Sequence, residues 1–405
     1  MRRIAWISLV VLVFAIPWEY SLDLGAPFGN VARILGLISC LLTGMAVLQA
    51  GGARRFSRLH FLTLALYAWL CCSYFWTLTP DGTLAHLRGY AQEMMLLWLV
   101  WEFVEDLSDL RVLLWSWLAG SWVLAVLTIG AFAAAGRWGV EQIRFAAVGQ
   151  DPNDVARYLN FGFPIAGLLL VQGKRWLQYV AAFGYIAVAF AAVLLTASRS
   201  GFLIATVALA GCGLIVLLRS RHRTAIGFLA LVSSAAFVLI AAPPGTLQRL
   251  GTMREVWRNP DLNQRMNIWL HGWRAFERAP MLGYGAGSFV TAAEVASEDT
   301  AHNSALAIMV ESGLCGLMLA SAIVMTVVSG IHRTRGSLRP GLSVLMIVWG
   351  LSAFVGTVGE NRMTWLLFGV IAAGERLSCE APDEITDEIG TTGGGINRNW
   401  QECLR

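Results

Sequence analysis

Long apolar runs separated by short polar turns make up most of the chain as far as about residue 377. Most of these runs have the ~20 residues that a helix needs to cross the hydrocarbon core of a bilayer. Reading the runs one after another predicts about twelve spanning helices. They fall at residues 4–18, 30–49, 60–78, 88–104, 110–134, 153–171, 177–196, 200–218, 224–242, 303–329, 341–357 and 362–377.

A long polar segment, residues 243–301, interrupts this pattern and is too polar to span a membrane. Two stretches within it carry apolar residues at helical spacing, which is typical of helices that lie on a membrane surface or cap a bundle. The first stripe is Leu247, Leu250, Met253, Val256 and Trp257. The second is Met266, Trp269, Leu270, Trp273 and Phe276, with Arg265, Arg274 and Arg278 off the stripe.

The composition agrees with a membrane protein, because 57% of the 405 residues are hydrophobic and only 14% are charged. A soluble domain is nearer half apolar and a quarter charged. Open sheets cannot satisfy their backbone groups in lipid, so we expect helices. The predicted fold class is an all-α polytopic membrane helix bundle over residues 1–378 that includes the large outer loop 243–301. The polar stretch 379–405 is expected to be a disordered tail.

The net charge argues against a nucleic-acid partner, and the cysteine spacing argues against a metal site. The net charge is only +4, so nucleic acid is not expected as a partner. None of the seven cysteines shows metal-ligand spacing, and we interpret them as small buried hydrophobes. Residues 1–14 look like a signal peptide, but no small-residue cleavage site follows, so we expect an uncleaved first span.

The arginines predict the orientation, because cytoplasmic loops are enriched in basic residues. Basic clusters at residues 2–3, 54–58, 174–175, 219–223 and 333–339 all fall on one side of the predicted bundle. With an even number of spans, both termini are expected to be cytoplasmic. The loop 243–301 is then on the outer face.

The stretch TASRSG at residues 196–201 places Arg199 in a tight turn between two apolar runs, on the predicted outer side. Ser200 is a candidate N-cap for the following helix. An arginine beside exposed helix amides is suited to binding an anion. The alternative is an interfacial arginine whose charged group reaches water and binds nothing.

Polar residues stand at the starts of three more predicted outer-side helices. Asp151 or Asn153 can cap the helix at 153–171, with Arg157 about one turn inside. Asn263 is a candidate cap for an amphipathic helix with Arg265 in its first turn. At the start of the helix at 303–329, His302 precedes the cap and Glu311 lies about two turns in.

The chemistry that fits this set is transfer from a diphosphate leaving group. Arginines and helix amides can neutralise pyrophosphate without a metal, and a histidine of near-neutral pKa can accept a proton from an attacking hydroxyl. We therefore expect no cofactor and no metal. The alternative for His302 is a cap or surface residue without a chemical role.

Three blocks carry a family resemblance: TASRSGFL, NQRMNIWLHGWRAFERAPMLGYGAGSF and AHNSALAIMVESGLCGLMLA. Their order and spacing, and the large loop before the histidine, resemble the O-antigen ligase and O-antigen polymerase-like membrane proteins. The resemblance implies a C-type glycosyltransferase-like bundle in the bacterial inner membrane, with its active site on the periplasmic face. The implied donor is an undecaprenyl-diphosphate-linked glycan, and the implied acceptor is lipid A–core or another glycan.

Positions in the resembling blocks suggest roles. By this resemblance Arg199 and Arg265 bind the diphosphate, and His302 activates or positions the acceptor hydroxyl. Asn303, Glu311 and Gly285 match recurring positions of unassigned role, and together with Arg157 and Asn153 they are candidate substrate-binding residues. The resemblance leaves ligase, surface-polysaccharide polymerase and protein glycosyltransferase open.

A secondary transporter or lipid-linked glycan flippase is the main alternative from another class. Transporters place ionisable groups near the bilayer midplane and often contain pairs of broken helices. The deepest charges here, Glu93, Arg157 and Glu311, are expected within two turns of the outer surface. The sequence shows no convincing pair of broken helices.

Overall fold

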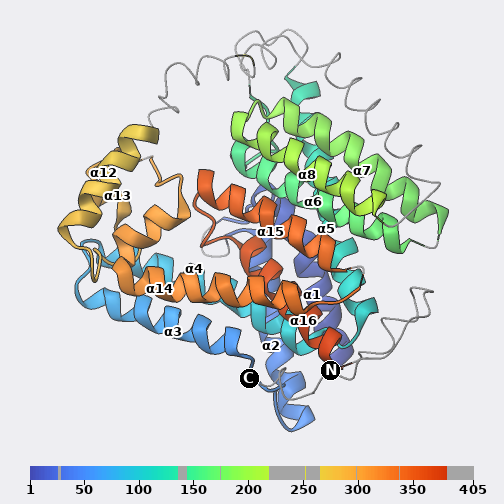
Figure 1. The fold of residues 1–405 in the computed structure, drawn as a ribbon, viewed down its shortest axis with the longest axis horizontal. Helices are drawn as coiled ribbons and strands as arrows, with labels where there is room; N and C mark the ends of the chain where they lie inside the picture. The colour runs from blue at the N-terminus through green and yellow to red at the C-terminus, as the bar shows by residue number, and fades with distance from the viewer. Residues whose placement is uncertain are drawn as a thin grey trace.

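The computed structural model describes residues 1–25, 29–135, 144–173, 175–218, 251, 265–297, 299–336 and 338–380. Over these ranges the chain forms thirteen α-helices, two short 3₁₀ helices and no β-strand (Figure 1). The chain is therefore an all-α polytopic membrane protein, as the hydrophobic pattern predicts.

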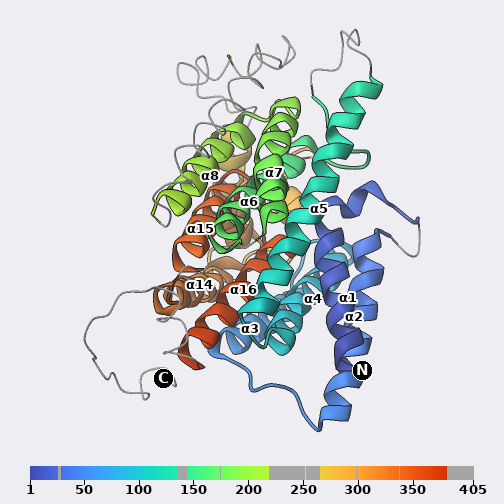
Figure 2. The ribbon, with the colours of Figure 1, turned by 90° about the vertical axis from the view of Figure 1, so that its right-hand side faces the viewer.

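The helices follow the predicted runs closely. The α-helices are α1 (Arg2–Ala15), α2 (Val31–Ala50), α3 (Arg58–Cys72), α4 (Pro80–Phe103), α5 (Leu107–Ala134), α6 (Pro152–Gln172), α7 (Trp176–Leu195), α8 (Arg199–Leu217), α12 (Arg265–Arg278), α13 (Phe289–Ala293), α14 (Ser304–Arg333), α15 (Leu338–Val355) and α16 (Arg362–Glu380). The 3₁₀ helices are η1 (Ile16–Ser21) and η2 (Ser73–Phe75). Figure 2 shows α1 and α2 side by side, as their packing requires.

Eight of these helices are long and apolar enough to cross a membrane: α1 with η1, α2, α5, α6, α7, α8, α14 and α15. The predicted spans at 60–78, 88–104 and 362–377 correspond to α3, α4 and α16, which are shorter or more polar. The predicted span 224–242, the stripe from Leu247 to Trp257 and residues 381–405 of the predicted tail lie outside the described residues.

Two predicted boundaries are wrong by more than a turn. α3 ends at Cys72 rather than at residue 78, and α4 begins at Pro80 rather than at residue 88. Proline suits the first position of a helix, where its missing N–H leaves nothing unsatisfied. The polar residues of 80–88 do not end the helix but line one side of it, so an apolar pattern alone places the start too late.

α6 is the most deeply buried candidate span, with 83% of its window inside the protein. It packs against α5, α7, α8 and α15. Small residues allow a close approach to α8, since a Cβ on Gly201 would lie 2.5 Å from the Cβ of Ala156. Arg157 and Arg199 flank this contact in the sequence, so the packing brings the two arginine-bearing helix starts together.

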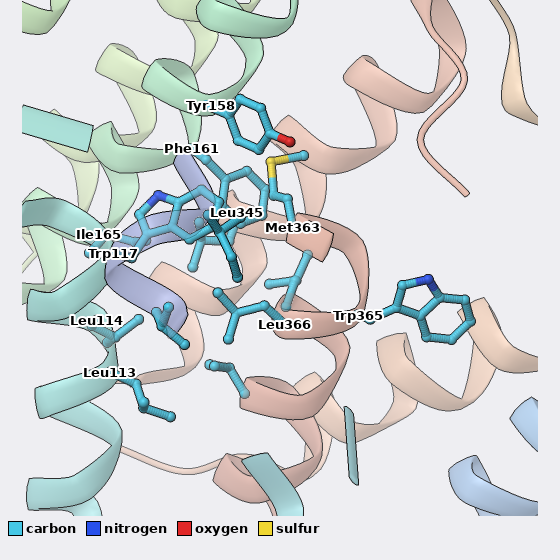
Figure 3. Close-up of a cluster of buried hydrophobic side chains, with 14 of the residues drawn as sticks. Leu113, Leu114, Trp117, Tyr158, Phe161, Ile165, Leu345, Met363, Trp365 and Leu366 are labelled. Atoms are coloured by element: carbon cyan, nitrogen blue, oxygen red, sulfur yellow. The ribbon is translucent and has the colours of Figure 1, made fainter. Parts of the chain in front are cut away.

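The main hydrophobic core lies where α5, α6, α15 and α16 meet (Figure 3). Leu113, Leu114 and Trp117 of α5 face Phe161 and Ile165 of α6 there, together with Leu345, Met363 and Leu366. Trp365 points away from this cluster (Figure 3), and its Nε1 donates to the carbonyl of Gly359 at 2.9 Å. Trp365 thereby fixes the 356–361 loop, which joins α15 to α16.

A second, smaller core joins α12 and α13 to the first half of α14. Its buried residues are Ile268, Ala275, Phe276, Phe289, Ala292, Ala293, Ala301, Leu306, Ala307 and Val310. Three residues of the predicted apolar stripe on α12, Met266, Leu270 and Trp273, are exposed. α12 packs through the face that carries Ile268 and Gly272, where a glycine permits close contact with Leu306.

α14 is broken at Gly313, whose backbone is non-helical at φ 63° and ψ −164°. The break frees carbonyl groups that other segments then satisfy. The carbonyls of Val310 and Glu311 accept from the backbone N–H groups of Tyr284 and Gly285, at 2.9 and 2.8 Å. Trp69 Nε1 donates to the Ser312 carbonyl at 3.0 Å. The outer loop is thus fastened to the middle of α14.

Candidate functional site

The turn before α8 holds Arg199 at the first helical position. Ser198, not the expected Ser200, is the N-cap, and its Oγ accepts from the Gly201 N–H at 3.1 Å. Ala197 has a left-handed backbone, with φ 47°. This conformation is unfavourable for a residue with a Cβ, and such strain is most common at functional turns.

The start of α6 is tied to this turn through Asn153. Asp151 is the N-cap and accepts from the Asn153 N–H at 2.7 Å, while Pro152 is the first helical residue. The Oδ1 of Asn153 accepts from Arg144 Nη2 and from Ser198 Oγ, both at 2.9 Å. Asn153 therefore holds a third arginine-bearing segment against the α8 turn. Arg144 is a residue that the sequence prediction missed.

Arg157 lies on the next turn of α6 and reaches towards the 356–361 loop. Its Nη1 pairs with Asp154 at 2.7 Å, and its side chain is only 12% exposed. A Cβ on Gly356 would lie 2.5 Å from Arg157 Nη2, so the glycine makes room for the guanidinium. The α15–α16 connection thus borders the arginine side chains.

The start of α14 carries His302 and Asn303. Asn303 is the N-cap, and its Oδ1 accepts from the Leu306 N–H at 3.0 Å, as its position before the helix suggests. His302 has a left-handed backbone at φ 45°, and its Nδ1 lies 3.3 Å from Thr300 Oγ1. Trp269 of α12 donates to the carbonyl of Ala301 at 3.0 Å, which couples the start of α14 to α12.

Electrostatics show that these helix starts lie close together. Partial burial lowers the pKa of the Arg265 guanidinium, and the charges of Arg199, Arg157 and Arg144 lower it further. Burial also lowers the pKa of His302, with a further contribution from the charge of Arg265. His302 is therefore neutral at pH 7, the form in which an imidazole can accept a proton.

We call the side chains of Arg144, Arg157, Arg199 and Arg265 the arginine cluster. Asp154 pairs with Arg157, and Asp151 offsets part of the charge at Arg265. Arginines in such an arrangement attract phosphate groups and can donate two hydrogen bonds at once to the phosphate oxygens. The cluster is suited to a multiply charged anion, with a neutral histidine beside it.

Gly285 and Glu311 lie at the break in α14 rather than in the arginine cluster. Gly285 has φ 93°, and a Cβ there would lie 2.5 Å from Thr77. The Glu311 carboxylate accepts from the backbone N–H groups of Gly287 and Phe289, which hold the start of α13. Both residues position the outer loop, and their predicted contact with substrate stays a prediction.

A second polar region was not predicted and is built around one face of α4. His86, Tyr90 and Glu93 follow each other at helical spacing, and His86 Nδ1 is hydrogen-bonded to Glu360 of the 356–361 loop. Glu311 acts electrostatically on His86 and on Tyr90. We call these five residues the acidic cluster. The spacing 86, 90, 93 in an apolar helix is the sequence signal that could have revealed it.

Buried charges behind the acidic cluster connect it to η1. Arg362, the first residue of α16, is paired with the buried carboxylate of Glu19. Glu93 is 7% exposed, and its Oε2 has no hydrogen-bond partner among the described residues. Within the same ranges, no group of three or more His, Cys, Asp or Glu side chains is arranged to hold a metal ion.

Comparison with known protein families finds a match to part of the chain. Residues 184–321 match the family described as O-antigen ligase, a stretch that runs from α7 to the middle of α14 and contains Arg199, Arg265 and His302. No curated protein matches the chain with significance. Over this stretch the chain is similar to the O-antigen ligase family, which is an enzyme family of ligases and polymerases.

Proposed function

We propose that this protein transfers a glycan from an undecaprenyl-diphosphate carrier to a hydroxyl group of an acceptor. The arginine cluster holds the diphosphate, through Arg199 and Arg265 above all, and neutralises the charge that develops as the leaving group departs. His302 accepts the proton of the attacking hydroxyl, or positions that hydroxyl. Neither step needs a metal, because cationic side chains supply the charge.

The observation that carries this proposal is the electrostatic proximity of Arg265 to three other arginines and to His302. Burying like charges together costs free energy, and a bound anion offsets that cost. A histidine kept neutral beside the same arginines is ready to act as a base at physiological pH. Transfer of a glycan from a diphosphate to a hydroxyl group would use both the arginine cluster and the neutral histidine.

We further propose that the arginine cluster faces the periplasm and that both termini are cytoplasmic in the bacterial inner membrane. Basic residues gather at the opposite ends of the helices. Arg2 pairs with Glu105 at 2.6 Å, and Arg333 pairs with Glu375 at 3.0 Å. α14 begins beside the arginine cluster and ends at Arg333, so the two regions lie at opposite ends of one long helix. Excess positive charge marks the cytoplasmic end.

Reconstitution tests the activity and separates its variants. The full chain in proteoliposomes receives an undecaprenyl-diphosphate oligosaccharide, with and without lipid A–core. Longer lipid-linked glycan without added acceptor identifies a polymerase, and product formed only with lipid A–core identifies a ligase. Absence of transfer to either acceptor, while the protein remains folded, would contradict both, and transfer to an added protein would instead identify a protein glycosyltransferase.

A further inference from the structure

The acidic cluster of His86, Tyr90, Glu93, Glu311 and Glu360 has the opposite chemistry to the arginine cluster. Its side chains are three carboxyl groups, one phenol and one imidazole, so it lacks the arginines that hold a phosphate. Carboxylates accept hydrogen bonds, and hydroxyl groups donate them. A ligand rich in hydroxyl groups fits these side chains, whereas a phosphate-bearing ligand does not.

A buried oxygen shows that the acidic cluster is incomplete on its own. The Oε2 of Glu93 is buried and has no hydrogen-bond partner among the described residues. Leaving such an acceptor unsatisfied is unfavourable. Glu93 shares its helix face with His86, and Glu360 acts on it electrostatically, so the oxygen belongs to the same cluster.

The entrance of the acidic cluster is formed by the His86–Glu360 pair. The side chains of His86 and Glu360 are 35% and 29% exposed, so both can be reached from outside. A Cβ on Gly287 would lie 2.4 Å from His86 Cδ2, so the outer loop packs directly on the imidazole. The bond from Nδ1 to Glu360 fixes the ring.

Two short segments set the distance between the two clusters. From Asn303, beside His302, to Glu311 is eight helical residues, or about 12 Å. From Gly356, which borders Arg157, to Glu360 is four residues, which span at most about 14 Å. One elongated molecule can therefore reach from the His86–Glu360 pair to His302.

We propose that the acidic cluster is a binding site for the acceptor glycan, with His86 and Glu360 hydrogen-bonding hydroxyl groups of a sugar set back from the reacting end. This inference rests on the proposed glycan transfer. The donor's diphosphate binds the arginine cluster, and the acceptor's sugars bind the acidic cluster. His86 and Glu360 act on acceptor binding, while proton removal stays with His302.

The test measures binding of two lipid-free probes, a core oligosaccharide and a repeat-unit oligosaccharide, to the purified full chain in nanodiscs. We expect the wild type to bind at least one of them. Glu360→Gln removes the charge with little change of shape and should weaken that binding at least about tenfold, as should His86→Gln. Glu294→Gln, on the exposed outer loop, is the matched control and should bind normally.

Inorganic pyrophosphate serves as the second probe in the same samples. Its affinity should be unchanged in Glu360→Gln, because it binds at the arginine cluster. In the transfer assay, Glu360→Gln should raise the acceptor KM about tenfold and leave the donor KM unchanged. Unchanged thermal unfolding of each variant shows that the fold is intact, and Glu93→Gln supplies a third variant if His86→Gln unfolds.

The inference is overturned if neither oligosaccharide binds the wild type, or if Glu360→Gln binds sugar as well as Glu294→Gln does. Equal losses of sugar and pyrophosphate binding also overturn it, since they indicate a general disturbance. The proposed glycan transfer fails separately, when the wild type transfers nothing to any acceptor. Sugar binding that depends on Glu360 would still stand in that case.

Discussion

The arginine cluster and the acidic cluster occupy neighbouring parts of one molecule but are built in different ways. The arginine cluster gathers side chains from the starts of three helices, α6, α8 and α12, and from the segment before α6. The acidic cluster is built along a single face of α4, against the 356–361 loop and the outer loop. The contrast teaches that charge is sorted here: cations converge at helix N-termini, and carboxyl groups from α4, α14 and the 356–361 loop gather beside α4.

Replacing His302 should have the largest effect on activity if it is the base. His302→Ala is expected to lower kcat about 10²–10⁴-fold, because a positioned base is lost, while pyrophosphate affinity stays unchanged. Steady-state kinetics with the reconstituted protein make the measurement. Full transfer by a well-expressed His302→Ala variant would remove His302 from the chemistry.

The pH profile sharpens this prediction. Burial and Arg265 lower the pKa of His302 below its ordinary value of 6.5, so the neutral form persists as pH falls to that lowered pKa. The acid limb of kcat/KM should therefore lie below pH 6.5. In Arg265→Gln the remaining activity should show this limb at higher pH, since a repelling charge is gone. If the acid limb of Arg265→Gln lies at the same pH as in the wild type or at a lower pH, the charge of Arg265 does not lower the pKa of His302.

Removing an arginine should have the next largest effect. Arg199→Ala and Arg265→Ala are each expected to lower kcat/KM for the donor about 10²–10³-fold, as the loss of one charge-stabilising group does. Arg265→Lys should recover part of the lost kcat/KM, since lysine keeps the positive charge but cannot donate two parallel hydrogen bonds to a phosphate. Arg274→Ala, on the exposed face of α12, is the control and should be near wild type.

Replacing Gly285 separates structural from chemical importance. Gly285→Ala forces a Cβ into a left-handed backbone and to 2.5 Å from Thr77, and it should destabilise the protein by about 1–3 kcal/mol. Gly25→Ala has a similar φ of 73° but open space around it, so its cost should be near 1 kcal/mol or less. Thermal unfolding measures both. Equal shifts would mean that the contact with Thr77 contributes nothing.

The smallest expected effect is at Asn153, which positions other residues. Asn153→Ala removes the acceptor shared by Arg144 and Ser198 and should weaken donor binding about tenfold. Asn153→Asp keeps that acceptor and should restore binding. If the two variants bind the donor equally well, the shared acceptor does not hold the cluster together.

Most of the fold could be predicted because hydrophobic runs in a membrane protein map directly onto helices. The errors are local and have clear causes. α4 begins eight residues early, at Pro80, because polar residues can line a helix that other helices cover. On α12 the apolar stripe predicted a helix but not its packing, because Ile268 and Gly272, outside the stripe, are buried while Met266, Leu270 and Trp273 are exposed.

The candidate site was predictable where its residues mark helix starts. Arg199 follows the cap Ser198 and His302 precedes the cap Asn303, and caps leave a signature in the sequence. Arg265 is the first residue of α12. Arg144 could not be found in this way, because it lies in a loop and reaches the cluster through bonds to Asn153 and to the carbonyl of Thr196. The pairing of His86 with Glu360 spans 274 residues, and no local pattern predicts a contact at that separation.

The most direct test of the central claim is the affinity of the purified protein for an undecaprenyl-diphosphate glycan against the matching monophosphate. We predict that the wild type binds the diphosphate at least about tenfold more tightly, and that the doubly substituted Arg199→Ala/Arg265→Ala protein loses this preference while Glu360→Gln keeps it. Equal affinity of the wild type for the two lipids, or an unchanged preference in the double variant, would contradict the assignment of the arginine cluster to the donor's diphosphate.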